Sequence, residues 1–159
     1  MTADCDLQAA LLVYAVPART ALTPEQNAGA HCVWCGATVP PGAGLDLGGH
    51  GGWIPYGCPA CYEVQRAWLR TYLEWAGHVR ACATCRAGCW CATSADFQGR
   101  LTESAHRADR PPVVCARCEK EVEAAERFEP HIRAGGHPPR IGYVHAAVCP
   151  GDERRWPCP

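Results

Sequence analysis

The sequence predicts a small α+β protein with short hairpins and two or three helices, in which clustered cysteines replace much of an aliphatic core. Only 25 of the 159 residues are Leu, Ile, Val or Phe, less than the share of about 20% at which a self-sufficient core becomes doubtful. Thirteen cysteines, six tryptophans and five tyrosines accompany a net charge of −1, which is not the composition of a disordered tail. The cysteines are the expected source of the missing stability.

The N-terminal third is expected to hold short elements separated by turns. Residues 7–16 are mostly apolar, but their periodicity does not decide between a short helix and a buried strand. Thr23-Pro24-Glu25-Gln26 carries a capping-box signature for a short helix that ends near Gly29. Apolar alternation and Gly/Pro-rich turns between residues 39 and 56 predict hairpin strands.

The strongest helix signal begins at Cys58-Pro59-Ala60-Cys61. Residues at spacings of three and four share one face of this helix, and they are Cys61, Val64, Trp68, Tyr72 and Trp75. Gly77 is expected to end this helix. A second helix is predicted after a cap at Thr93 or Ser94, and its apolar face is Phe97, Leu101 and Ala105.

The domain organisation follows from a helix-breaking segment, Arg110-Pro111-Pro112. It predicts an N-terminal metal-binding module over residues 1–109 and a C-terminal module over 110–150. In the second module, a turn at 135–139 is expected to lead into a strand at 141–145. Residues 151–159 are expected to form a flexible tail.

The start of the chain is acidic, unlike a secretory signal, and its longest apolar run is far shorter than the roughly 20 residues that span a bilayer. These features predict a cytoplasmic protein without membrane contact, in a compartment where clustered thiols bind metal more often than they form disulfides. An odd number of cysteines also disfavours complete disulfide pairing.

Four Cys-x2-Cys pairs indicate metal binding, because thiolates at this spacing can point at one ion from a tight turn. The ligands of the first expected site are Cys32, Cys35, Cys58 and Cys61. A knuckle, a hairpin and a helix whose first turn completes the site resemble a treble-clef zinc finger. Four thiolates leave no open position for catalysis, so this zinc is expected to be structural.

A second site is expected in the compact cluster Cys82, Cys85, Cys89 and Cys91. A rival partition joins Cys82 and Cys85 with Cys115 and Cys118. We favour the local set because a short loop closes at lower entropic cost. Cys89 or Cys91 can alternatively be a small buried residue.

A third site is expected from Cys115, Cys118, His145 and Cys149. An imidazole followed four positions later by a thiolate is a familiar zinc half-site, and an alternating pattern over residues 141–145 suggests a strand that delivers the histidine. Cys158 is the alternative to His145. Three four-ligand sites predict about three zinc ions per chain, with Cys5 and Cys158 outside them.

The segment 17–29 leading into Cys32-Val33-Trp34-Cys35-Gly36, with the later pairs Cys58/Cys61 and Cys82/Cys85, resembles a signature of small uncharacterised cysteine-rich zinc-finger proteins of high-GC bacteria. The likeness covers roughly residues 17–107. The segment with Cys115, Tyr143, His145 and Cys149 resembles a second unit often found in such proteins. The resemblance implies zinc binding, tandem treble-clef or zinc-ribbon-like modules and a cytoplasmic location, and it implies no particular activity.

The favoured function is a non-enzymatic zinc-binding adaptor or regulatory protein that presents a surface to a protein or a nucleic acid, with no small-molecule substrate evident. Sixteen acidic and fifteen basic residues give no large positive field. One alternative is a redox-sensing or iron–sulfur regulator that uses Cys82–Cys91, since cysteine spacing alone does not separate the metals. A treble-clef nuclease is less favoured, because His50 and His78 have no evident partner in the sequence.

Overall fold

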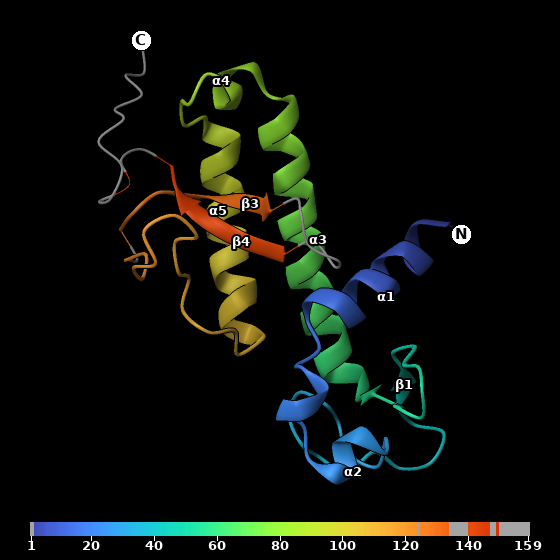
Figure 1. The fold of residues 1–159 in the computed structure, drawn as a ribbon. Helices are drawn as coiled ribbons and strands as arrows, with labels where there is room; N and C mark the ends of the chain where they lie inside the picture. Colours follow the sequence, from blue (N-terminus) through green and yellow to red (C-terminus); the bar gives the residue numbers. More distant parts are fainter. Residues whose placement is uncertain (1, 124, 134–139, 147–148, 150–159) are drawn as a thin grey trace. The chain divides into compact units, whose positions relative to one another are not determined.

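The computed structural model describes residues 2–123, 125–133, 140–146 and 149, and they divide the chain into two compact units, Met1–Arg70 and Thr71–Pro159. The described residues form five α-helices and two small antiparallel sheets (Figure 1), so the chain is α+β. The helices beyond the two or three that were predicted include the N-terminal helix, which periodicity left undecided, and a helix of only four residues at Ala83–Arg86. The predicted turn at 135–139 and tail at 151–159 lie outside the described residues.

The first unit begins with the helix α1 (Thr2–Tyr14), which decides the ambiguity of the N-terminal apolar segment in favour of a helix. Leu7, Leu11 and Ala15 are buried at intervals of four residues, which matches one face of a helix rather than of a strand. A 3₁₀ turn (Arg19–Ala21) and the short helix α2 (Pro24–Asn27) follow. The predicted capping box is present: the Thr23 hydroxyl accepts from the Gln26 N–H, and the Gln26 side chain accepts from the Thr23 N–H.

A pair of two-residue strands and one aromatic ring connect the parts of this unit. The strands β1 (Leu45–Asp46) and β2 (Tyr56–Gly57) pair antiparallel, with Asp46 opposite Tyr56. The Trp34 indole donates to the Ala15 carbonyl oxygen over 3.0 Å and thereby ties the end of α1 to the segment that follows α2. A Cβ atom at position 57 would collide with the Trp34 ring, so only glycine allows this close approach.

The long helix α3 (Pro59–Ala81) contributes its first part to unit one and its last part to unit two. It passes through Gly77, where the sequence predicted its end. Glycine lowers helix propensity without breaking the backbone hydrogen bonds, and buried neighbours such as Trp75 and Ala76 outweigh that cost. The continuation of α3 places His78 in its last turn.

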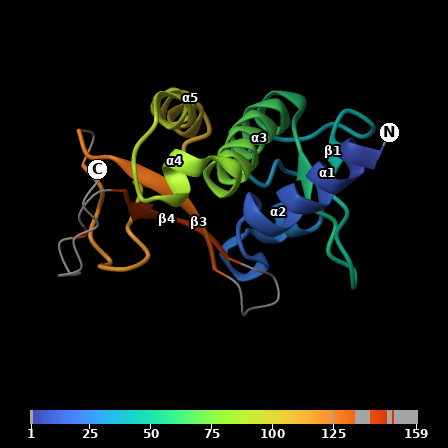
Figure 2. The same ribbon diagram turned by 90° about the horizontal axis from the view of Figure 1, so that it is seen from above.

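The second unit contains the helices α4 (Ala83–Arg86) and α5 (Ala92–Arg107) and a hairpin of β3 (Phe128–Arg133) and β4 (Arg140–His145). The N-cap of α5 is Cys91, two or three residues before the predicted cap, because its sulfur accepts the Ser94 N–H. The hairpin lies against α5 and the last part of α3 (Figures 1 and 2). Among the described residues, no helix combines the length and apolarity needed to cross a membrane.

Aromatic side chains supply the bulk of the second core. Trp75 is fully buried and its ring contacts Phe97 and Phe128 at centroid distances of 6.5 and 5.6 Å. The Tyr72 hydroxyl lies within 3.0 Å of carbonyl oxygens in both hairpin strands. Because these contacts join α3 and α5 to the chain beyond residue 110, the unit boundary lies within α3, whereas the sequence placed a boundary at 109/110.

Candidate metal centres

The first group of candidate ligands contains the four cysteines expected at the first site: Cys32, Cys35, Cys58 and Cys61. The first two lie on a tight turn after α2, Cys58 follows β2, and Cys61 lies in the first turn of α3. All four sulfur atoms lie within 4.8 Å of one another, and the Cys35 and Cys58 sulfurs are 4.0 Å apart. The fold therefore brings together two pairs that are far apart in the sequence.

The environment of this group stabilises a thiolate at Cys32. Its sulfur is buried and accepts the Cys58 N–H over 3.3 Å. Burial raises the pKa of the Cys32 thiol, but hydrogen bonds from backbone N–H groups outweigh burial and lower the pKa to about 7. Burial raises the pKa of Cys61 above its ordinary range. A cation at the centre of the group would favour the thiolate form of all four cysteines.

The second group is His78, Cys82, Cys85 and Cys91, and it corrects the sequence-based set at one position. The Nε2 atom of His78 lies 3.1 Å from the Cys91 sulfur and 3.6 Å from the Cys85 sulfur. Cys89, which was expected as a ligand, is not one of the four; its thiol is directed at the Ala87 carbonyl oxygen over 3.9 Å. The rival partition is not observed either, since Cys115 and Cys118 lie in the third group.

His78 was missed because α3 was expected to stop one residue before it. A usable signal was nevertheless present, since His78-x3-Cys82 has the same spacing as His145-x3-Cys149, which was recognised as a half-site. In a helix, residues four apart lie on one face. The last turn of α3 can therefore direct His78 toward the loop that begins at Cys82.

The pKa values of two thiols in the second group are shifted in opposite directions. Although burial raises the pKa of Cys91, hydrogen bonds from Ser94 and His78 outweigh it and lower the pKa to about 6. Burial raises the pKa of Cys85 to about 11. The sulfurs of these two residues are 3.5 Å apart, so the charge of one thiolate disfavours ionisation of the other unless a cation lies between them.

The third group contains the expected residues Cys115, Cys118, His145 and Cys149. The Cys115 and Cys149 sulfurs are 3.8 Å apart, and Nδ1 of His145 lies 3.6 Å from the Cys118 sulfur. The other ring nitrogen, Nε2, lies 3.4 Å from a Glu126 carboxylate oxygen. This contact favours a proton on Nε2 and leaves Nδ1 as the donor atom for a metal. Cys158, the alternative to His145, lies outside the described residues.

The Cys-x2-Cys turn of group one and that of group three have the same backbone hydrogen-bond pattern. In each, the residue after the second cysteine donates its N–H to the carbonyl oxygen of the first, Gly36 to Cys32 and Glu119 to Cys115. That donor residue has a positive φ in both turns, 70° at Gly36 and 60° at Glu119. The flanking residues also pair alike, His31 with Thr38 and Val114 with Glu121.

The correspondence extends to the hairpin that follows each turn. Cys32 forms a parallel bridge with Tyr56, and Cys115 forms one with Tyr143. In both cases a ligand stands two residues after the tyrosine, Cys58 in the first group and His145 in the third. Groups one and three are therefore the same knuckle-and-hairpin arrangement, completed by different final ligands.

The interatomic distances fit a single tetrahedral ion in each group. A tetrahedron with metal–sulfur bonds of about 2.3 Å and metal–nitrogen bonds of about 2.0–2.1 Å has sulfur–sulfur edges of about 3.8 Å and sulfur–nitrogen edges of about 3.6 Å. One sulfur–sulfur pair in each group lies near this edge, at 4.0, 3.5 and 3.8 Å, and all ligand atoms of a group lie within 4.8 Å. The sulfur–nitrogen distances are 3.1 and 3.6 Å in the second group and 3.6 Å in the third. A multinuclear iron–sulfur cluster would hold its cysteine sulfurs farther apart, because iron and sulfide ions would lie between them. The ligand sets favour one soft or borderline cation per group.

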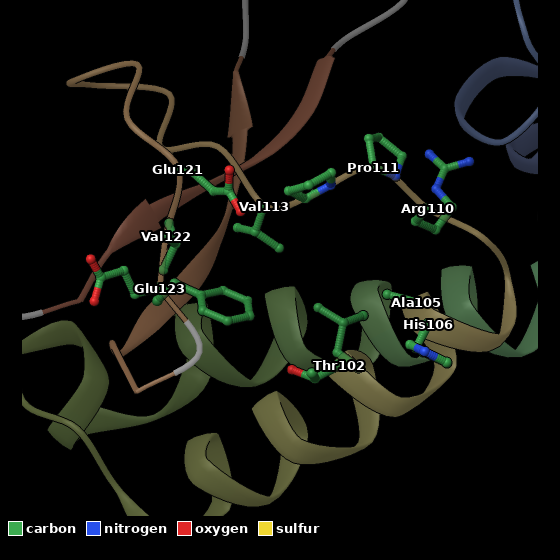
Figure 3. A pocket seen from close by; sticks show the side chains of 12 residues that line it. Thr102, Ala105, His106, Arg110, Pro111, Val113, Glu121, Val122 and Glu123 are labelled. Carbon is green, nitrogen blue, oxygen red and sulfur yellow. The ribbon is translucent and has the colours of Figure 1, made fainter.

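The second unit also contains a partly open cavity of about 320 Å³ between α5 and the segment after it (Figure 3). Thr102 and Val113 point toward it from opposite sides. Its apolar lining is Leu101, Ala105, Pro111, Pro112, Val113, Val122 and Phe128. Charged residues of both signs, among them Arg110 and Glu121, stand among the lining residues.

Comparison of the chain with protein-family models, with curated proteins and with solved structures finds no match. The assignment of function therefore depends on the residues of this chain.

His78 and Cys89 can be distinguished by metal content. We expect His78→Ala to lower the number of bound ions by one relative to the wild-type chain, because the second group loses one of its four ligands. Cys89→Ser, the matched control in the same segment, should retain the wild-type number. Elemental analysis and native mass spectrometry of the purified, reduced protein measure this number. Loss of an ion from the Cys89 variant, but not from the His78 variant, would restore the sequence-based ligand set.

Because Gly36 and Glu119 both have a positive φ in equivalent turns, we expect substitutions at these two positions to change the free energy of unfolding in opposite directions. A Cβ atom added at Gly36 has open space but a positive φ, so Gly36→Ala should lower the free energy of unfolding by about 1 kcal/mol. Glu119→Gly relieves the same strain and should raise the free energy of unfolding by up to about 1 kcal/mol. The gain is reduced by the greater conformational entropy of the unfolded chain with glycine. Urea unfolding of the metal-loaded chain tests both. Gly77→Ala within α3 is a control that should be neutral or stabilising, and equal effects at positions 36 and 119 would contradict the equivalence.

Proposed function

We propose that the protein is a non-enzymatic, cytoplasmic zinc-binding adaptor in which each of the three groups holds one structural zinc ion. The observation that supports this proposal most directly is that each group offers four mutually close Cys or His ligands. Structural zinc is bound by four protein ligands, whereas catalytic zinc keeps a position for water or substrate. The first group, with four cysteines, and the other two, each with three cysteines and one histidine, are closed sets of this kind.

Zinc is the proposed ion because the ligand types and distances suit it. Thiolate-rich tetrahedral sites with one imidazole favour zinc over the harder cations magnesium and calcium. The eleven cysteines from Cys32 to Cys149 form no disulfide, which is the state that persists in a reducing compartment. The contact of His145 with Glu126 also matches the way in which zinc-bound histidines are commonly oriented.

We further propose that groups one and three are tandem treble-clef-like modules. Group one has the order expected of such a module: a knuckle, a hairpin and a helix whose first turn supplies the last ligand. Group three repeats the knuckle and the hairpin and is completed by His145-x3-Cys149. Group two differs, because it is built from the last turn of α3, the short α4 and the N-cap of α5.

The energetic argument for metal follows from the small aliphatic core. Structural zinc contributes about 10–16 kcal/mol of apparent binding free energy per site, and a domain's net stability is about 5–15 kcal/mol. Even one such ion is therefore comparable with the whole folding free energy of a unit. Metal binding can offset the shortage of Leu, Ile, Val and Phe.

For the adaptor role, we propose a protein partner that inserts a bulky apolar side chain into the cavity beside α5. The cavity is mainly apolar, and its volume of about 320 Å³ accommodates one such side chain. The lining charges of Arg110, Glu121 and Glu123 have mixed signs, and the net charge of the chain is −1, so the positive field that attracts the phosphate backbone of a nucleic acid is lacking.

The metal proposal predicts close to three zinc ions per chain and unfolding when they are removed. Treatment with a strong chelator under reducing conditions should abolish NMR dispersion and the cooperative melting transition, because each unit loses the bonds that join its distant segments. Adding zinc back should restore both. A chelated, metal-free protein with an unchanged melting curve would contradict the structural role of the metal.

The partner proposal can be tested with a displayed random-peptide library and the zinc-loaded chain. We expect the selected peptides to share a bulky apolar residue and to lose at least tenfold in affinity for Ala105→Trp, whose indole fills the cavity. Glu103→Trp on the same helix is the control, since residue 103 is exposed and does not line the cavity. Peptides that bind both variants equally well would contradict this site.

A further inference from the structure

Ser94 lies in the first turn of α5 and is 1% exposed, although it is a polar residue. Its hydroxyl oxygen lies 3.3 Å from the Trp75 indole nitrogen and 3.3 Å from the Cys85 sulfur. Its backbone N–H also donates to the Cys91 sulfur over 3.4 Å. One buried residue therefore contacts two of the four members of the second group.

The direction of these hydrogen bonds follows from which groups can donate a proton. An indole N–H can only donate, so the Ser94 oxygen accepts from Trp75. The single hydroxyl proton of Ser94 is then available for the Cys85 sulfur, which is an acceptor when it is a thiolate. The result is a relay that runs from the Trp75 indole through Ser94 to Cys85.

We propose that Ser94 is a positioning residue for the metal ion of the second group. This inference depends on the proposed function, because it assumes that the group binds a metal. The hydroxyl orients the Cys85 thiolate and takes up part of its negative charge, while the N–H of the same residue orients Cys91. Partners of this kind fix the geometry of metal ligands and tune their donor strength.

The relay also couples the second group to the aromatic core. Trp75 contacts Phe97 on α5 and Phe128 on β3, and its N–H group is satisfied by Ser94. Ser94 is the one residue between the Trp75 indole nitrogen and the Cys85 sulfur. The Trp75 indole proton is therefore expected to respond to a change at Ser94.

The test uses the full-length chain loaded with ¹¹³Cd, which replaces zinc in thiolate sites and gives one NMR resonance per bound ion. The signal of the second group is assigned as the one that His78→Cys shifts. We expect Ser94→Ala to shift that resonance alone and to make it disappear at a chelator concentration about tenfold lower than in the wild type, since loss of such partners costs about 10–100-fold in metal affinity.

Two further variants separate positioning from simple packing. Ser94→Thr keeps the hydroxyl and should retain the wild-type resonance position and chelator midpoint. Ser104→Ala removes a hydroxyl on the same helix that bonds the Leu101 carbonyl oxygen, and it should leave all three resonances unchanged. The Trp75 indole proton resonance, identified by its loss in Trp75→Phe, should shift in Ser94→Ala.

The inference is overturned if Ser94→Ala leaves the second resonance and its chelator midpoint as in the wild type. It is also overturned if all three resonances weaken together, since that is the effect of a general loss of stability. A wild-type chain that gives no cadmium resonances would instead contradict the proposed function. The two failures are therefore distinguishable.

Discussion

Mutual repulsion among clustered thiolates is the constraint that the fold has to meet, and a bound cation would relieve it. Each group places four ligand atoms within 4.8 Å of one another, and local hydrogen bonds lower the pKa of one thiol in each group to about 7 or 6. Negative charge would accumulate at these points if no cation were bound. A divalent ion bound in each group would convert this repulsion into bonds that connect turns, strand ends and helix ends.

The orientation of the first two ligands in groups one and three is set by the local backbone of a short turn. Two knuckles with matching hydrogen bonds and matching positive φ values each direct a pair of thiols to one side. The chain then returns through a hairpin to deliver the second pair. In group one the second pair of ligands lies at the start of a helix, and in group three it begins at the end of a strand. Both are compatible with the same turn, because only the two ligand atoms of the second pair have to reach the first pair.

Aromatic residues provide the second source of stability, and one of them is connected to the second ligand group by a single intervening residue. Trp75 contacts three other aromatic rings, those of Trp90, Phe97 and Phe128. Tyr72 bridges the two strands of the second hairpin. Through Ser94, the indole of Trp75 is joined to the Cys85 sulfur. Core packing and ligand orientation are thus coupled in the second unit.

The sequence by itself determined the capping box at Thr23 and the Cys-x2-Cys turns, because these depend on short spacings. It also predicted the α+β class and the members of groups one and three, with Cys158 left open as the alternative to His145. Only the tertiary structure decided the fourth member of group two, the extent of α3 and the place of the unit boundary. Spacing alone does not distinguish Cys89 from His78, because both are near Cys82 along the chain. Burial of the α3 face against aromatic side chains outweighs the weak helix propensity of Gly77, carries the helix on to His78 and so brings its imidazole to the thiols.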